Sequence, residues 1–184
     1  RVLKMTHLEH HKHTNNPDLD PDYDSHAPSA LAAIWKALKV RNPESEQLLS
    51  YQKTLDRLDP EQAGLAKRDG IIINLTYLAV LFAMAATGHA LEAFLLWVLP
   101  LALALVYIRF FLAWAPHHPG HETGRYRDTR AFKSLFGVIG TMGMTVHIVH
   151  HLHPRIPLDR TPAAFREMRP ILQARNCDLG GLHE

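Results

Sequence analysis

The chain has 184 residues, of which 47% are hydrophobic and 21% charged, and its formal net charge is +2. This small charge, without a basic run interleaved with aromatic residues, argues against a nucleic-acid-binding protein. The single cysteine, Cys177, excludes an internal disulfide framework and fits a reducing compartment. The 14 histidines are more than packing needs in a chain of this size, which indicates a chemical role for some of them.

The first predicted element is the end of a helix over residues 1–13, which contains His7-Leu8-Glu9-His10-His11. Positions i, i+3 and i+4 share one helix face, so we expect three imidazoles to gather there. Turn-forming residues follow over residues 14–22 and should end the helix. Because the chain starts with Arg1 and no apolar segment precedes the cluster, we expect a fragment whose N-terminal part is missing.

Two segments with helical character precede the strongly apolar part of the chain. Residues 28–40 place apolar side chains at helical spacing, with lysines between them. This helix either lies in a membrane surface, with Trp35 at the headgroup level, or packs against protein. Residues 44–68 are polar and helix-prone, and they end in Lys67-Arg68-Asp69-Gly70.

Residues 71–87 and 93–114 are two apolar stretches near the ~17–20 residues that a membrane span needs. The link at 88–92 has no Lys or Arg, whereas both flanks carry several, so the positive-inside rule places the flanks in the cytoplasm. Arg109 lies about one turn from that end, where its side chain can reach the headgroups. Because two spans return the chain to the side that it left, we expect everything beyond them to share the cytoplasm with residues 1–70.

The remaining elements lead into a second copy of the histidine pattern. Pro116-His117-His118-Pro119 follows the second span. Residues 131–146 are moderately apolar but contain three glycines, which favours a helix along the membrane interface, or dipping into it, over a third span. His147-Ile148-Val149-His150-His151 comes next, and the tail from Leu158 predicts a polar amphipathic helix.

Two histidine clusters on one side of a membrane predict a shared metal site. Imidazole suits iron, zinc and copper, and six converging rings could hold more than one ion. One histidine at the end of the second span is a plausible further ligand, with His117 preferred to His118. The expected metal ligands are His7, His10, His11, His117, His147, His150 and His151.

The other histidines are expected to lie outside this set. His13 and His153 extend the clusters but point away from the cluster face, and His121 lies beyond a turn. Three more are predicted to be ordinary surface residues, namely His26, His89 and His183.

A metal-bound imidazole usually donates its second ring N–H to an acceptor such as a carboxylate. The candidate acceptors are Asp18, Asp20, Asp22 and Asp159. At least one of the four is expected to be an ordinary solvated acidic residue.

These motifs resemble the membrane-bound, histidine-coordinated di-iron oxygenases of the fatty acid desaturase superfamily. Residues 7–22 are similar to the second histidine box of that family with its Thr-Asn-x-Pro-x-x-Asp-Pro-Asp tail, and residues 147–157 to the third. Residues 116–119 with 125–129 resemble a segment of bacterial members, including carotenoid hydroxylase-like ones. The first box, His-x(3 or 4)-His, is absent and is expected upstream of Arg1, so we expect this fragment alone to be inactive.

The resemblance implies an all-α integral membrane protein. Residues 1–184 would form one N-terminally truncated domain, in which a transmembrane hairpin at 71–114 joins cytoplasmic segments 1–70 and 115–184 that carry the boxes. The expected location is the bacterial inner membrane, with the metal site on the cytoplasmic side.

The resemblance also implies the chemistry. Two non-haem iron ions would use O2 and an external electron donor, ferredoxin or cytochrome b5-like, to desaturate a fatty-acyl chain. No catalytic residue beyond the metal ligands is expected. Hydroxylation of a carotenoid or another lipid is the alternative within the class.

Two function classes outside this superfamily are disfavoured. A membrane metal transporter or metal-binding protein should carry ligands within its spans, and these two spans contain no histidine. A soluble zinc hydrolase would have to bury both apolar stretches.

Overall fold

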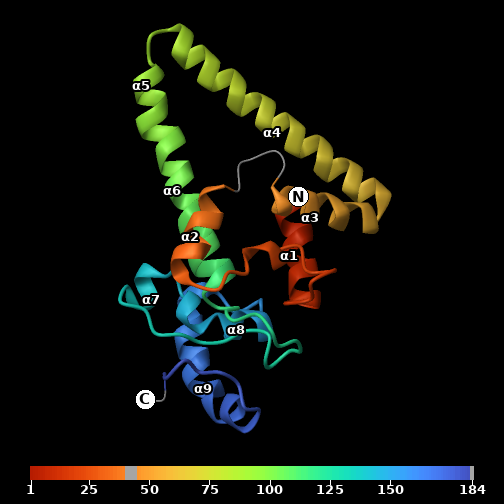
Figure 1. Cartoon of the computed structure of the whole chain (residues 1–184), viewed down its shortest axis with the longest axis vertical. Helices are drawn as coiled ribbons and strands as arrows, with labels where there is room; N and C mark the ends of the chain where they lie inside the picture. Colours follow the sequence, from red (N-terminus) through yellow and green to blue (C-terminus); the bar gives the residue numbers. More distant parts are fainter. Residues whose placement is uncertain (40–44, 183–184) are drawn as a thin grey trace.

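Two long apolar helices extend from one side of the protein in the computed structural model, which describes residues 1–39 and 45–182 (Figure 1). The first, α4 (Pro60–Ala86), has 27 residues. The second runs over 25 residues, Ala90–Trp114, and consists of α5 (Ala90–Ala93), α6 (Leu99–Ile108) and the π-type turns Phe94–Val98 and Arg109–Trp114. At 1.5 Å per residue each helix is about 40 Å long, which exceeds the ~30 Å hydrocarbon core of a bilayer.

The surfaces of these two helices are apolar and almost entirely uncovered. Of the most apolar window in each helix, 0% and 6% of the residues are buried. The core helix of a soluble protein would bury this surface, because exposing so much apolar area to water is unfavourable. The prediction of two apolar stretches long enough to cross a membrane is therefore confirmed.

The described residues are all helix, turn or loop, in agreement with the predicted all-α class. The histidine clusters lie on α1 (Val2–His13) and α8 (His147–Leu152), and α9 (Thr161–Ala174) packs behind α8. Short 3-10 turns cover Tyr23–Ser25, Met144–Val146 and Leu158–Arg160.

The helix-prone character of residues 44–68 is confirmed for the described residues from Ser45 on, which form parts of two helices. The structure has α3 (Glu46–Arg57), a break, and then α4, which begins at Pro60 and continues through Lys67–Gly70 without interruption. The break is encoded locally, because the Asp59 side chain accepts a hydrogen bond from the Gln62 N–H at 2.9 Å and a proline at the first helical position loses no hydrogen bond.

The amphipathic helix predicted over residues 28–40 is α2 (Ala30–Leu38), and Ser29 caps it through the Ala32 N–H. Ala33 is buried against Trp114 at the end of the second long helix. The opposite face exposes Leu31 by 80% and Trp35 by 62%. Residue 40, where the predicted helix ends, lies outside the described residues.

The helix predicted over residues 131–146 is wrong. The segment is largely loop, with one helical turn, α7 (Gly137–Gly140), and the 3-10 turn that precedes α8. Gly137, Met142 and Gly143 have φ values of 60°, 50° and 82°. A right-handed helix cannot continue through residues with positive φ, so the glycines break it rather than weaken it.

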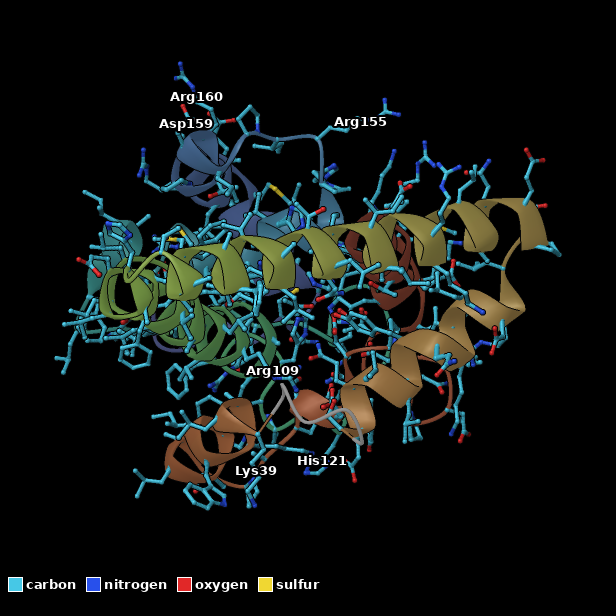
Figure 2. All side chains as sticks on the ribbon, turned by 90° about the horizontal axis from the view of Figure 1, so that it is seen from above. Lys39, Arg109, His121, Arg155, Asp159 and Arg160 are labelled. Carbon is cyan, nitrogen blue, oxygen red and sulfur yellow. The ribbon has the colours of Figure 1, made fainter. Side chains whose placement is uncertain are left out.

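Arg109 does not reach toward headgroups as predicted. Its side chain is 7% exposed and its Nη2 atom lies 2.9 Å from Oδ2 of Asp24. Figure 2 labels Arg109 where the second long helix meets the rest of the protein. The ion pair therefore ties the base of that helix to the loop that follows α1.

The apolar core lies behind α8. Ile148, Val149 and Leu152 are buried against Phe165 and Leu172, which lie on the inner face of α9. The predicted amphipathic tail is thereby confirmed. Because this core takes the apolar face of α8, the histidines of α8 are turned toward α1.

Candidate metal centre

The two histidine clusters meet in space. Figure 1 shows α1 and α8 on the side opposite the turn that joins the two long helices. His11 and His150 are 139 residues apart in sequence, yet their Nε2 atoms are 3.2 Å apart. The Nε2 atom of His7 lies 3.2 Å from that of His150 and 3.1 Å from that of His11. We call these three residues the outer trio, because His7 is exposed.

A second group, the inner trio, consists of His10, His117 and His151, whose potential ligand nitrogens all lie within 4.8 Å of one another. Their ring centroids are 4.8–5.1 Å apart. The Nε2 atoms of His117 and His151 are buried and have no hydrogen-bond partner among the residues that the structure describes. Unpartnered buried nitrogens are costly, and a bound cation would satisfy them.

The two trios interleave on the same two helices. α1 contributes His7 and His11 to the outer trio and His10 to the inner one, while α8 contributes His150 and His151 respectively. The i, i+3, i+4 spacing in α1 therefore divides its imidazoles between two neighbouring points rather than aiming them at one.

His147 belongs to neither trio but lies beside both. Its ring centroid is 4.8 Å from that of His151 and 5.2 Å from that of His150. Its Nδ1 atom is buried and has no hydrogen-bond partner within residues 1–39 and 45–182. The structure thus brings all seven predicted ligands into one cluster, and their role as ligands stays a prediction.

Electrostatics favour the neutral imidazoles that metal binding requires. Burial lowers the pKa of His11 to about 3 and that of His150 to about 4. Burial also holds the pKa values of His117, His147 and His151 well below the ordinary value. At neutral pH these rings are uncharged and offer free lone pairs.

The spacing of the outer trio fits a single ion. Three nitrogens bound to one ion at about 2.1 Å lie roughly 3 Å apart, which matches the separations within this trio. Borderline imidazole donors with no thiolate among them suit iron and zinc.

His10 differs from the other cluster histidines because Asp20 holds it. Its Nδ1 atom is 2.8 Å from Oδ1 of Asp20, which leaves Nε2 as the nitrogen available to an ion. Burial alone lowers the pKa of His10, but the bond and charge of Asp20 outweigh burial and raise it. The backbone N–H groups of Asn15 and Asp22 donate to Asp20 at 2.8 Å and fix the carboxylate. Asp20 is thus the one predicted carboxylate acceptor that the structure places against a cluster histidine.

His117 is oriented by a backbone group instead. Its Nδ1 atom lies 3.0 Å from the carbonyl oxygen of Asp128, so its Nε2 atom faces the inner trio. Burial raises the pKa of the Asp128 carboxyl to about 6. The preference for His117 over His118 agrees with this geometry, because His118 packs against Trp114.

The other candidate acceptors bind none of the cluster histidines. Asp22 accepts a hydrogen bond from the Tyr51 hydroxyl at 2.8 Å, and Asp18 is exposed. Asp159 lies 3.5 Å from Arg160, with both side chains about three-quarters exposed. Figure 2 shows both at the edge of the molecule, pointing outward, so Asp159 is an ordinary solvated residue.

Asn15 is a supporting residue that the sequence did not reveal. Its side-chain amide donates to the carbonyl oxygens of Glu122 at 2.7 Å and Asp128 at 2.9 Å. Its φ of 64° is left-handed, a conformation that asparagine tolerates. Its Oδ1 atom lies 3.1 Å from Nε2 of His26, so the prediction of His26 as an ordinary surface residue is wrong. The turn-forming composition indicated a turn here, but not its long-range partners.

The remaining histidines lie outside both trios. His153, His121 and His89 are exposed, and His13 is half-buried beside Glu9. His183 lies outside the described residues.

Comparison with known proteins gives a family match over nearly the whole chain. The model of the family described as fatty acid desaturase matches residues 3–178. A beta-carotene ketolase from Paracoccus sp. (strain N81106 / MBIC 01143) is 26% identical over 172 residues, which cover 89% of this chain and 57% of that protein. A beta-carotene ketolase from Paracoccus sp. (strain PC1) is 25% identical over 170 residues, which cover 87% and 56%. The chain therefore spans about half the length of these curated relatives, and no solved structure gave a significant match.

Proposed function

The chain belongs to the fatty acid desaturase family, and from that premise we propose that it is a membrane-bound oxidoreductase that uses two iron ions and O2 to oxidise a long-chain lipid. The convergence of both histidine clusters into two neighbouring trios carries this proposal. One trio per ion is the simplest division of six imidazoles, with His147 beside them as a further donor.

The proposed chemistry divides between the ions and the chain. Bound iron would supply activation of O2 for removal of hydrogen from an unactivated C–H bond. Burial lowers the pKa values of His117 and His151 and so holds these two imidazoles neutral, and it also keeps bulk water from the inner trio. Asp20 and the Asp128 carbonyl hold the second nitrogens of His10 and His117, so the ligand nitrogens are oriented in advance. An external electron donor, ferredoxin or cytochrome b5-like, belongs to the proposal.

We propose that the chain crosses a membrane twice and that its two spans form a hairpin. The uncovered apolar surfaces of α4 and of Ala90–Trp114 support insertion. Because α1 and α8 lie on the same side of both helices, the histidines would face one compartment, and the arginine distribution favours the cytoplasm of a bacterial cell. A lipid substrate would then reach the site from the bilayer.

Desaturation of a fatty-acyl chain is the proposed reaction, and the match to the fatty acid desaturase family supports it. Oxidation of a carotenoid is the second candidate, and the two beta-carotene ketolase relatives favour it. Both candidates require the same metal site and differ in the shape of the substrate.

Lipid profiling separates the two candidates. The complete protein would be expressed in a host that makes both membrane fatty acids and β-carotene, with His10→Ala as the inactive control. New double bonds in acyl chains that require His10 support desaturation, and oxygenated pigment that requires His10 supports the carotenoid reaction. Identical lipids from the two strains would contradict the proposed function.

A further inference from the structure

A groove of about 660 Å³ separates the N-terminal half of α9 from the loop that precedes α7. None of the seven cluster histidines lines it, so it is distinct from the metal centre. Its lining combines three cationic side chains with several apolar ones, a combination that suits an amphiphile.

The cationic part has three basic residues and unused hydrogen-bond donors. Lys133, Arg166 and Arg169 line the groove, and no acidic residue within 1–39 or 45–182 does. Arg169 donates one bond from Nη2 to the Leu182 carbonyl at 2.9 Å, but its Nε atom is buried and has no partner among the described residues. Thr145, which is 4% exposed, lines the same groove, and its hydroxyl also lacks a partner in the part of the chain that the structure describes.

These unsatisfied groups indicate an anionic ligand. A buried donor without an acceptor costs free energy of roughly 1–3 kcal/mol, so such groups in a native fold usually have a partner. An oxygen-rich anion such as a phosphate would accept from Arg169 and Thr145 and would balance the three positive charges.

The apolar part continues to the proposed membrane surface. Leu135 and Val138 line the groove, and Leu135 and its neighbour Ile139 are essentially fully exposed. Phe136 packs edge-to-face on Phe111 of the second long helix, with ring centroids 5.8 Å apart. The Tyr107 hydroxyl donates to the Gly140 carbonyl, which fixes α7 beside the same helix. The apolar wall therefore adjoins the surface that would face lipid.

We propose that this groove binds an anionic phospholipid of the bilayer. The phosphate would lie among Lys133, Arg166 and Arg169, and an acyl chain would cover Leu135 and Val138 toward the second long helix. Continuity with the apolar helix surface identifies the bilayer as the source, because a free phosphate would leave the apolar wall uncovered. Thr145 and Val146 lie immediately before α8, so the bound lipid would also steady the entry to the helix that carries His147, His150 and His151.

Lipid binding by the complete protein tests the proposal without any catalytic readout. The purified protein in uncharged detergent would be titrated with palmitoyl-oleoyl phosphatidylglycerol or with the phosphatidylcholine of the same chains, and retained lipid would be counted by native mass spectrometry. We expect tighter binding of phosphatidylglycerol. One cation near a lipid headgroup is worth about fivefold in affinity, so Arg166→Gln and Lys133→Gln should each weaken this binding by about that factor.

Arg160→Gln is the matched control. It removes the same charge from an exposed side chain that does not line the groove, and it should leave phosphatidylglycerol binding unchanged. Val138→Ser tests the apolar wall, and should weaken phosphatidylglycerol binding while leaving any binding of inorganic phosphate unchanged.

Three results would overturn the proposal. Equal affinity for the two phospholipids would show that the groove does not recognise an anionic headgroup. An equal loss of phosphatidylglycerol affinity in Arg160→Gln would show that the binding depends only on the overall charge of the protein. Inorganic phosphate competing as well as the lipid, together with an unaffected Val138→Ser, would assign the groove to a free anion. Because iron content is measured separately on the same samples, failure here is distinguishable from failure of the proposed enzyme function.

Discussion

The outer and inner trios are built from the same two helices but are held in place differently. The outer trio comes entirely from α1 and α8, so helix spacing and the approach of two helices place its nitrogens. The inner trio adds His117 from a third segment, and Asp20 and the Asp128 carbonyl orient two of its members. The comparison teaches that helical periodicity and one approach of two helices are sufficient for the outer trio, whereas the inner trio also needs a third segment and two orienting hydrogen bonds.

Removing one ligand from either trio should have the largest effect. We expect His10→Ala and His150→Ala each to lower activity of the complete protein by more than about 100-fold, since ligand loss exceeds the 10–100-fold typical of a lost supporting residue. Turnover with measured iron content is the readout. His89→Ala, an exposed residue in the turn between the long helices, is the control and should behave like wild type. Equal tolerance of all three changes would end the metal-site assignment.

Asp20→Asn should weaken the inner trio selectively. The amide of the variant can still accept a hydrogen bond from His10, but it lacks the negative charge that raises the pKa of His10. The iron affinity of the inner trio should therefore fall by about 10–100-fold. Iron titration should then resolve one weak and one nearly unchanged site.

Asp159→Asn is the matched control for that experiment, because the Asp159 side chain is solvated and pairs with Arg160 instead of a histidine. If Asp20→Asn and Asp159→Asn bind iron identically, Asp20 does not support a ligand.

The Arg109–Asp24 pair should contribute to stability rather than to iron binding. Both side chains are less than a tenth exposed, so Arg109→Met leaves an unpaired buried carboxylate and should cost about 3–5 kcal/mol. Arg68→Met breaks an exposed pair with Asp69 and should cost about 0–1 kcal/mol. Unfolding in detergent measures both.

Asp24→Asn in the Arg109→Met background should recover part of the loss, because it removes the stranded charge. A double variant no more stable than Arg109→Met alone would contradict the role assigned to the pair.

Acid should destabilise the metal-free protein. Burial holds the pKa of His11 at about 3 and that of His150 at about 4, below the unfolded value of about 6.5. At pH values between the folded and unfolded pKa values, the unfolded chain therefore binds more protons than the folded chain. Stability is therefore complete above about pH 6.5 and falls as the pH drops toward 4. The raised pKa of His10 acts in the opposite direction and offsets only part of the loss.

Thermal unfolding of the metal-free protein at about pH 7 and about pH 5 checks this effect. His150→Gln removes one of the histidines with a lowered pKa, so its unfolding midpoint should differ less between the two pH values. A midpoint that does not move in the wild type would show that the trios are more solvated than their burial indicates.

The parts of the structure that the sequence predicted depend on neighbouring residues. The helical spacing in His7–His11 and His147–His151 predicted α1 and α8 with their clustered imidazoles. Long uncharged stretches predicted α4 and Ala90–Trp114, because their apolar composition requires no tertiary contact to recognise.

The features that the sequence did not predict depend on single residues that interrupt or cap a helix, or on contacts between residues far apart in the chain. The positive φ of Met142 and Gly143 interrupts the helix that the composition of residues 131–146 favoured, and the cap at Asp59 divides the helix-prone segment 44–68 between α3 and α4. Asn15 acts through carbonyls 107 and 113 residues away, and no pattern near position 15 encodes those partners. The same reason hid the Asp24–Arg109 pair.

Metal analysis of the purified complete protein tests the central claim most directly. Two trios that each hold one ion predict about two iron ions per chain, falling to about one in His11→Ala, which lacks only an outer ligand, and in His117→Ala, which lacks only an inner one. Protein that contains zinc or no metal, with the same content in both variants, would contradict the account.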